Sequence, residues 1–283
     1  MQGHGKAGQQ ENQEPAHAPD ELGRRARWAA AGRQVYARAA MGAARGAEMV
    51  RRAWQSAAPA LLPSACALCG SVQRDVVCAP CADDLLRPLR RCPVCALALG
   101  RHAGCPACAA MPPAFDHACT LGDYASPQDS LVLSLKFGHA LPLADWLADR
   151  LAAALPTAWA AQGLSPPDLL APIPLAPQRL AARGFNQAWE IARPLARRLG
   201  LRADPVLLRR RRDTGSQRAL DLAGRQVNLR DAFRLTRPAR LDGLHVALVD
   251  DVMTSGATLH EAALALKAHG AVRVSVIVAL RTP

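Results

Sequence analysis

The stretch that most restricts the fold of this chain is Val-Ala-Leu-Val-Asp-Asp-Val-Met-Thr-Ser-Gly-Ala-Thr at residues 246–258. Its first four residues form a short, unbroken apolar run, which is typical of a strand buried on both faces of a parallel sheet. Asp250 and Asp251 would stand at the carboxyl end of that strand, where open α/β sheets bind their ligands. The turn around Gly256 predicts the start of a helix that runs to about Ala268.

The residues after this strand suit a sugar phosphate. A helix that begins at a glycine turn presents free backbone amides and the positive end of its dipole, and neighbouring hydroxyl groups add further donors. Two carboxylates beside a phosphate are repulsive unless they meet sugar hydroxyls or Mg²⁺. The order of these groups therefore predicts a ribose 5-phosphate site. An ordinary strand end and a capped turn would explain each part but not their contiguity.

The whole run resembles the phosphoribosyl-pyrophosphate loop of type I phosphoribosyltransferases. The resemblance implies an α/β fold, in which a parallel sheet is flanked by helices. It also implies that Asp250 and Asp251 bind the ribose hydroxyls and that the following loop cradles the 5-phosphate. The residues of that loop are Thr254, Ser255, Gly256, Ala257 and Thr258.

Eight of the nine cysteines form four C-x-x-C pairs within a short segment. They are Cys66, Cys69, Cys78, Cys81, Cys92, Cys95, Cys105 and Cys108. Two residues between cysteines let both sulfurs reach one tetrahedral ion at about 2.3 Å, so the spacing predicts two Zn²⁺ sites with four thiolates each. Closed sites of this kind leave no open coordination position, and a segment of about 45 residues has too small a core to fold alone. We therefore expect structural zinc.

The spacing leaves the grouping of these cysteines open. The simplest grouping is sequential, with the first four cysteines on one ion and the last four on the other, although a crossed grouping is also possible. His102 could replace a sulfur in a less regular site. Disulfides or a redox dithiol are weaker alternatives. The ninth cysteine, Cys119, precedes an apolar stretch and is expected to be a small core residue.

The positive charge of the chain, +12, is concentrated near its beginning. Residues 22–58 contain eight arginines against one glutamate, in an alanine-rich context that favours helix. One interpretation of this segment is a basic amphipathic helix that binds either nucleic acid or an acidic surface. The other is a poorly ordered appendage without such a role. We expect an extension at residues 1–60, a double zinc-ribbon module at 61–112 and a phosphoribosyltransferase-like domain at 113–283.

The sequence contains no run of 18 or more uncharged apolar residues, and its polar opening lacks the pattern of a secretory signal. We therefore expect no stable membrane insertion and a cytoplasmic location. Strands are expected at about 120–124, 168–174 and 272–280. A segment at 130–137 leads into a helix at about 142–154, and another helix is expected to begin near Gln187.

A second set of residues is similar to the signature of the ComF family, which pairs zinc-binding cysteines with this type of domain. They are Pro172, Ile173, Pro174, Arg179, the run Arg183-Gly184-Phe185-Asn186-Gln187, Thr214, Gln217, Leu220, Arg225, Asn228 and Phe233. Guanidinium groups bind phosphate oxygens in bidentate fashion, so Arg179 and Arg183 suit a pyrophosphate. Asn186 and Gln187 could complete that shell, or the run is a turn with a buried phenylalanine and a capped helix.

The family resemblance has further implications. Lys136 matches a lysine of the family's early motif and is expected near the phosphates. The basic stretch 209–225 lies where phosphoribosyltransferases have a mobile loop, with Gly215 as a hinge. An enzyme of this kind would displace pyrophosphate at the anomeric carbon of phosphoribosyl pyrophosphate with Mg²⁺, but no residue identifies the acceptor. The family's association with natural competence leaves an alternative: a protein that binds single-stranded DNA or competence-machinery proteins without turnover.

Overall fold

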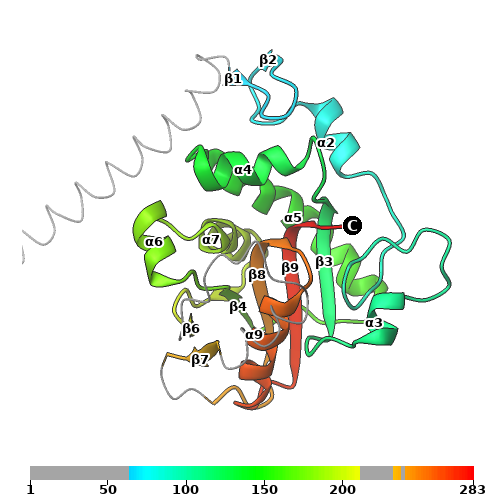
Figure 1. The fold of residues 1–283 in the computed structure, drawn as a ribbon, viewed down its shortest axis with the longest axis vertical. Coiled ribbons are helices and arrows are strands. Elements are labelled where there is room, and N and C mark those ends of the chain that lie inside the picture. Colours follow the sequence, from blue (N-terminus) through cyan, green and yellow to red (C-terminus); the bar gives the residue numbers. More distant parts are fainter. Residues whose placement is uncertain (1–63, 211–231, 237–239) are drawn as a thin grey trace, which may run out of the picture. The chain divides into compact units, whose positions relative to one another are not determined.

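The computed structural model describes residues 64–210, 232–236 and 240–283, which lie in one compact unit, Pro63–Pro283 (Figure 1). The basic extension, the hinge at Gly215 and the arginines Arg211 and Arg212 lie outside the described residues. So do five residues of the family signature, namely Thr214, Gln217, Leu220, Arg225 and Asn228. Among the described residues, no helix combines the length and the apolar character that a membrane span requires.

The centre of the molecule is a sheet of five parallel strands in the order β3-β9-β8-β4-β5. Their bounds are β3 (His117–Asp123), β4 (Leu169–Pro172), β5 (Arg202–Ala203), β8 (His245–Met253) and β9 (Arg273–Arg281). The apolar runs 246–249 and 276–280 are almost completely buried, because helices cover both faces of these central strands. The predicted parallel α/β fold is confirmed.

The two faces of the sheet carry different helices. On one face lie α4 (Asp129–Phe137), α5 (Leu141–Ala161) and α7 (Gln187–Leu199), which share a core with Ala247 and Val249. On the other face lies α9 (Ala257–Lys267), which shares a core with Val246 and Leu248 (Figure 1). Successive residues of β8 thus alternate between the two cores, as the period of a strand requires.

This arrangement places the carboxyl ends of β4 and β8 side by side. The strands are neighbours in register, with Ala171 beside Leu248 and Pro172 beside Val249. From β4 the chain continues through α6 (Pro177–Arg183) and α7 to β5, whereas from β8 it continues through α9 to β9 on the opposite side. Such a switch in direction between adjacent strands is where open α/β sheets bind ligands.

The cysteine-rich segment contains β1 (Ser64–Ala65), β2 (Val72–Gln73), α2 (Ala79–Leu85) and α3 (Pro106–Ala110). Its first half packs on the core that contains α4 and α5, through Cys66 and Leu85. The contact with β3 is tight, because a Cβ atom added at Gly122 would lie 2.7 Å from Leu85 Cδ1 and 2.9 Å from its carbonyl oxygen. Its second half contributes Cys92 and Cys95 to the core on the α9 side.

Several elements differ from expectation. The helix expected at about 142–154 is seven residues longer at its end, with Pro156 inside it, and the segment before it is a separate helix, α4. Helix α6 was not expected, because its seven residues carry too little apolar pattern. The family resemblance predicts a mobile loop over 209–225, but Arg209 and Arg210 lie on β6 (Leu208–Arg210), which pairs with β7 (Phe233–Leu235).

Candidate functional site

Two carboxylates, Asp250 and Asp251, stand at the end of β8, and side chains from other elements converge on Asp251. Lys136, near the end of α4, places its Nζ 2.9 Å from Oδ2 of Asp251. Gln187, the first residue of α7, donates from Nε2 to the same oxygen at 3.3 Å. Oδ1 of Asp250 accepts a hydrogen bond from the backbone N–H of Asp251 at 2.9 Å. Residues that are far apart in sequence thus form one polar cluster.

The electrostatics of this cluster favour a proton on Asp250. Burial raises the pKa of Asp250 to about 8, and the charge of Asp251 adds to the rise, while Lys136 opposes it. The cluster therefore holds two carboxyl groups with one ammonium group. A ligand that brings hydroxyl donors or a divalent cation would stabilise the fully ionised pair.

Beyond the carboxylates, the chain turns into α9 as the sequence predicts. Gly256 is the N-cap of this helix and has a φ of +80°, in the left-handed region that favours glycine. Thr254 and Ser255 are exposed, and Oγ of Ser255 accepts from the backbone N–H of Ala257 at 3.4 Å. No acidic side chain lies in the first turn of α9, so nothing there offsets the positive end of its dipole.

The segment after β4 brings arginine side chains toward the same carboxylates. Arg183, the last residue of α6, lies with its guanidinium 5.4 Å from the ring centre of Phe137. Burial lowers the pKa of Arg183 and the charge of Arg179 lowers it further, while Asp251 opposes both effects. Arg179 is exposed. Arg183 and Lys136 thus bring positive charge close to Asp251, in a combination that suits a phosphorylated ligand.

Asn186 and Gln187, which were expected to bind pyrophosphate, have distinct surroundings. Asn186 caps α7, because its Oδ1 accepts from the backbone N–H of Ala188 at 3.1 Å, and its Nδ2 donates to the carbonyl of Ile173 at 3.0 Å. The side chain of Asn186 is thus engaged within the chain. By contrast, Oε1 of Gln187 is buried and has no hydrogen-bond partner among the described residues. This acceptor beside the carboxylates adds an oxygen of the kind that Mg²⁺ prefers.

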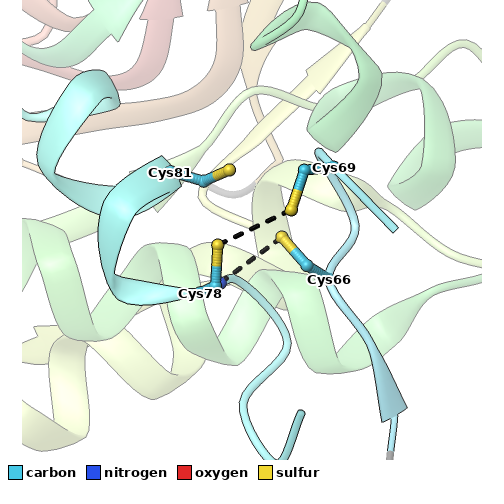
Figure 2. A group of neighbouring side chains, drawn as sticks. All are labelled: Cys66, Cys69, Cys78 and Cys81. Carbon is cyan, nitrogen blue, oxygen red and sulfur yellow. Dashed lines mark hydrogen bonds between the residues drawn. The ribbon is translucent and has the colours of Figure 1, made fainter. Parts of the chain in front are cut away.

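The first four cysteines, Cys66, Cys69, Cys78 and Cys81, form one cluster (Figure 2). All four sulfur atoms lie within 4.8 Å of one another, and the Sγ atoms of Cys69 and Cys78 are 3.7 Å apart. Burial raises the pKa of Cys66, but backbone N–H donors, including that of Cys78, outweigh this effect and lower it to about 6. The thiolate of Cys66, the form that binds metal, is therefore favoured, whereas the side-chain hydrogen bond with Cys78 and burial raise the pKa of Cys81 to about 12.

The last four cysteines, Cys92, Cys95, Cys105 and Cys108, form the second cluster. The Sγ atoms of Cys92 and Cys108 are 3.8 Å apart, and those of Cys95 and Cys105 are 3.6 Å apart. A tetrahedral ion with bonds of about 2.3 Å separates its ligands by about 3.8 Å, whereas a disulfide needs about 2.05 Å. Both clusters fit Zn²⁺. The cysteines are grouped sequentially, and His102 belongs to neither group.

Two residues near residues 254–258, the predicted phosphate loop, carry contacts that sequence reasoning missed. Arg281, at the end of β9, is buried and donates to backbone carbonyls of the cysteine-rich segment and of the loop after β8. His260 accepts a hydrogen bond at Nδ1 from the backbone N–H of Ala114 at 3.0 Å. The sequence offers one signal for the contacts of Arg281, which is a charged residue at the end of an apolar strand.

Comparison with known proteins agrees with this geometry. Residues 186–283 match the phosphoribosyl transferase domain family. DNA utilization protein YhgH of Salmonella typhi is 35% identical over 225 residues, which cover 78% of this chain and 98% of that protein. The protein of the same name from Escherichia coli K12 is 35% identical over 207 residues, which cover 73% of this chain and 90% of that protein. Competence protein F of Haemophilus influenzae is 30% identical over 207 residues, which cover 72% of this chain and 90% of that protein.

Proposed function

Because this chain belongs to the ComF family, together with DNA utilization protein YhgH and competence protein F, we propose that it binds phosphoribosyl pyrophosphate with Mg²⁺. The ligand binds at the carboxyl ends of β4 and β8, and the protein serves natural competence in the handling of incoming DNA. The proposed organisation is an extension at residues 1–60, a zinc module at 61–112 and the ligand-binding domain at 113–283.

The observation that carries the proposal is the convergence of Lys136, Gln187 and Arg183 on Asp251 at the carboxyl end of β8. A lone aspartate pair at a strand end has many explanations. An aspartate pair that faces cations from α4 and α6, and that precedes a helix start without an acidic residue, favours a ligand with both hydroxyl and phosphate groups.

Each part of the site has a role in this proposal. Asp250 and Asp251 accept hydrogen bonds from the ribose hydroxyls, and the amides of 254–258 bind the 5-phosphate. Arg179 and Arg183 bind the pyrophosphate. Mg²⁺, held by the ligand's phosphates and the oxygen donors of the aspartates and Gln187, supplies positive charge to the pyrophosphate. In turnover, these fixed charges would stabilise the departing pyrophosphate, so catalysis would be mainly electrostatic and positional.

The two cysteine clusters are proposed to hold one structural Zn²⁺ each. Each cluster supplies four sulfur atoms at tetrahedral spacing, which leaves no position for a substrate or an activated water. The ions would stabilise a segment that contributes little apolar core of its own, and thereby hold it against the sheet.

A second candidate function, binding of single-stranded DNA without turnover, is favoured by one surface feature. Phe137 is 66% exposed, and the guanidinium of Arg183 lies over its ring. An exposed aromatic ring beside an arginine is the combination on which nucleic-acid bases stack. Because Arg183 also faces Asp251, DNA and phosphoribosyl pyrophosphate would compete for this edge of the site.

The proposal is tested by calorimetric titration of the zinc-loaded protein with phosphoribosyl pyrophosphate and Mg²⁺. The variant Asp250→Asn/Asp251→Asn should lose about 100-fold or more in affinity, because hydrogen bonds to charged groups contribute about 1.5–3 kcal/mol each. The control Asp145→Asn/Asp149→Asn makes the same two substitutions on the exposed face of α5, where both residues pair with Arg198, and should bind normally. An equal loss in both variants, or no binding by the wild type, would reject the proposal.

A further inference from the structure

Arg281 joins the second cysteine cluster to the phosphate loop. Its Nε donates to the carbonyl of Cys95 at 3.1 Å, so one side of the guanidinium is fixed to a residue of the cluster. Its Nη1 lies 3.2 Å from the carbonyl oxygen of Met253 and 2.6 Å from that of Thr282, and it also contacts the carbonyl oxygen of Thr254. The side chain thus holds the backbone that leads into the loop.

The position of Arg281 is unusual for a charged group. Only 8% of the residue is exposed, and among the described residues no carboxylate forms an ion pair with it. A buried cation is costly unless an opposite charge lies nearby. Four thiolates with one Zn²⁺ carry a net charge of −2, so the metal-loaded second cluster is the anionic partner that this guanidinium lacks.

A second contact supports the phosphate loop from the same direction. The ring of Phe115, which follows the second cluster, is buried, and its Cζ would lie 3.8 Å from a Cβ atom at Gly256. The preceding backbone amide, that of Ala114, is bonded to His260 on α9. A cavity of about 230 Å³ lies between these parts, and its lining includes Cys108, Ser255 and Arg281. The second cluster and the phosphate loop therefore face the same cavity.

The first cluster is placed differently. Cys66 and Cys78 pack in the core with Leu85 and Leu121, on the face of the sheet opposite α9. Among the described residues, no hydrogen bond joins this cluster to residues 253–258. The two clusters have the same ligands but different neighbours, so each serves as a control for the other.

We infer that the metal ion of the second cluster, acting through Arg281, holds the phosphate loop in its ligand-binding conformation. Arg281 is a positioning residue, since it acts through its contacts with the loop backbone. Loss of the second metal ion should loosen residues 253–258, whereas loss of the first should not. The identity of the ligand in this inference rests on the proposed function. The effect of the second metal ion on the conformation of residues 253–258 does not depend on it.

The first test compares two matched variants that each keep the two more buried cysteines of one cluster. Cys105→Ser/Cys108→Ser removes the second metal site and Cys69→Ser/Cys81→Ser removes the first, and metal content by mass spectrometry should show one zinc fewer in each. We expect the second-cluster variant to bind phosphoribosyl pyrophosphate with Mg²⁺ at least tenfold more weakly, and the first-cluster variant to bind within twofold of wild type. Equal affinities would overturn the inference.

Amide hydrogen exchange in the ligand-free variants tests the link independently of any ligand. Exchange at residues 253–258 should be faster in the second-cluster variant and unchanged in the first-cluster variant. If the wild type does not bind phosphoribosyl pyrophosphate, the proposed function fails while this experiment still decides the inference. Unchanged exchange in the second-cluster variant would overturn it.

Substitution of Arg281 separates its role from that of the metal. Arg281→Met should retain both zinc ions and yet reproduce the faster exchange, while Arg281→Lys, which keeps the charge but reaches fewer carbonyls, should be intermediate. Arg273→Met, at the other end of the same strand, is the control and should behave as wild type. If Arg281→Met does not fold, the lysine variant decides. Wild-type exchange and affinity in Arg281→Lys would then remove Arg281 from the inference.

Discussion

Nζ of Lys136 lies 2.9 Å from Oδ2 of Asp251, so that α4 is joined to the end of the central strand β8 by a largely buried ion pair. The side chains are 21% and 6% exposed, respectively. Removing one partner of a buried pair leaves an uncompensated charge, which costs more than the pair itself contributes. A substitution of either Lys136 or Asp251 should therefore change the stability of the fold as well as the candidate site.

Replacement of Lys136 by methionine should lower the free energy of unfolding by about 3 kcal/mol, because Asp251 would stay buried without its cation. Lys136→Met/Asp251→Asn should be more stable than the single lysine variant, which a double-mutant cycle from urea unfolding would measure. Lys267→Met is the control. It breaks a pair with Asp116 that is about one-third exposed, so it should cost less than about 1 kcal/mol. If the two substitutions change the free energy of unfolding additively, this account of the Lys136–Asp251 pair would be contradicted.

The raised pKa of Asp250 predicts a specific pH dependence. Its pKa is 3.8 when unperturbed and about 8 in the folded chain, so between these values the folded state binds more protons than the unfolded state. The contribution of Asp250 to stability is therefore complete below about pH 4 and is lost as the pH rises through 8. A ligand that requires the carboxylate should bind more tightly as the pH rises, with release of a proton.

This proton release is measured by titration with phosphoribosyl pyrophosphate and Mg²⁺ at pH 7 in two buffers of different ionisation enthalpy. The wild type should release more protons than Asp250→Asn, whose residual affinity should vary less with pH. Identical proton release by the two proteins would show that Asp250 does not titrate on binding.

Gly122→Ala should separate the first cysteine cluster from the sheet. The new methyl group would overlap with Leu85, which must move together with α2, and such overpacking typically costs about 1–3 kcal/mol. We expect lower stability in urea and faster release of zinc to a chelator. Gly104→Ala is the control, since no atom lies within 4 Å of its Cβ position, and it should match wild type. Equal zinc release by both variants would contradict the packing described here.

The cysteine clusters predict two zinc ions per chain after purification without chelators. Co²⁺ should replace both and produce the absorption bands of tetrahedral thiolate coordination. Denaturation with a chelator should then release all nine cysteines as free thiols. A deficit of two or more thiols would instead support disulfides, which the sulfur separations of 3.6–3.8 Å exclude in this structure.

The parts of this protein that could be predicted from sequence are those whose signals are local. The strand at 246–249 was recognisable because its apolar run is unbroken. The metal-binding cysteines were recognisable because the C-x-x-C spacing lets two sulfurs reach one ion. The cysteine grouping was left open, since it depends on how the segment folds. The strand extends through the aspartates to Met253 because their backbone continues the ladder, with Asp250 beside Val278.

The remaining contacts depend on tertiary structure. Gln187 and Asp251 are 64 residues apart, and only the packing of α7 on β8 brings them together. Lys136 is predicted near phosphates, and its partner in the structure is a carboxylate, Asp251. A charged residue at the end of an apolar strand marks Arg281 in the sequence, but its acceptors are backbone carbonyls, which no side-chain pattern identifies.

The most direct test of the central claim is amide hydrogen exchange of the wild-type protein with and without phosphoribosyl pyrophosphate and Mg²⁺. Ligand binding at the candidate site should slow exchange at residues 254–258 and 183–187, and ribose 5-phosphate alone should protect only the first of these segments. Protection confined to other parts of the chain, or no protection at saturating ligand, would contradict the assignment of the carboxyl ends of β4 and β8 as a phosphoribosyl-pyrophosphate site.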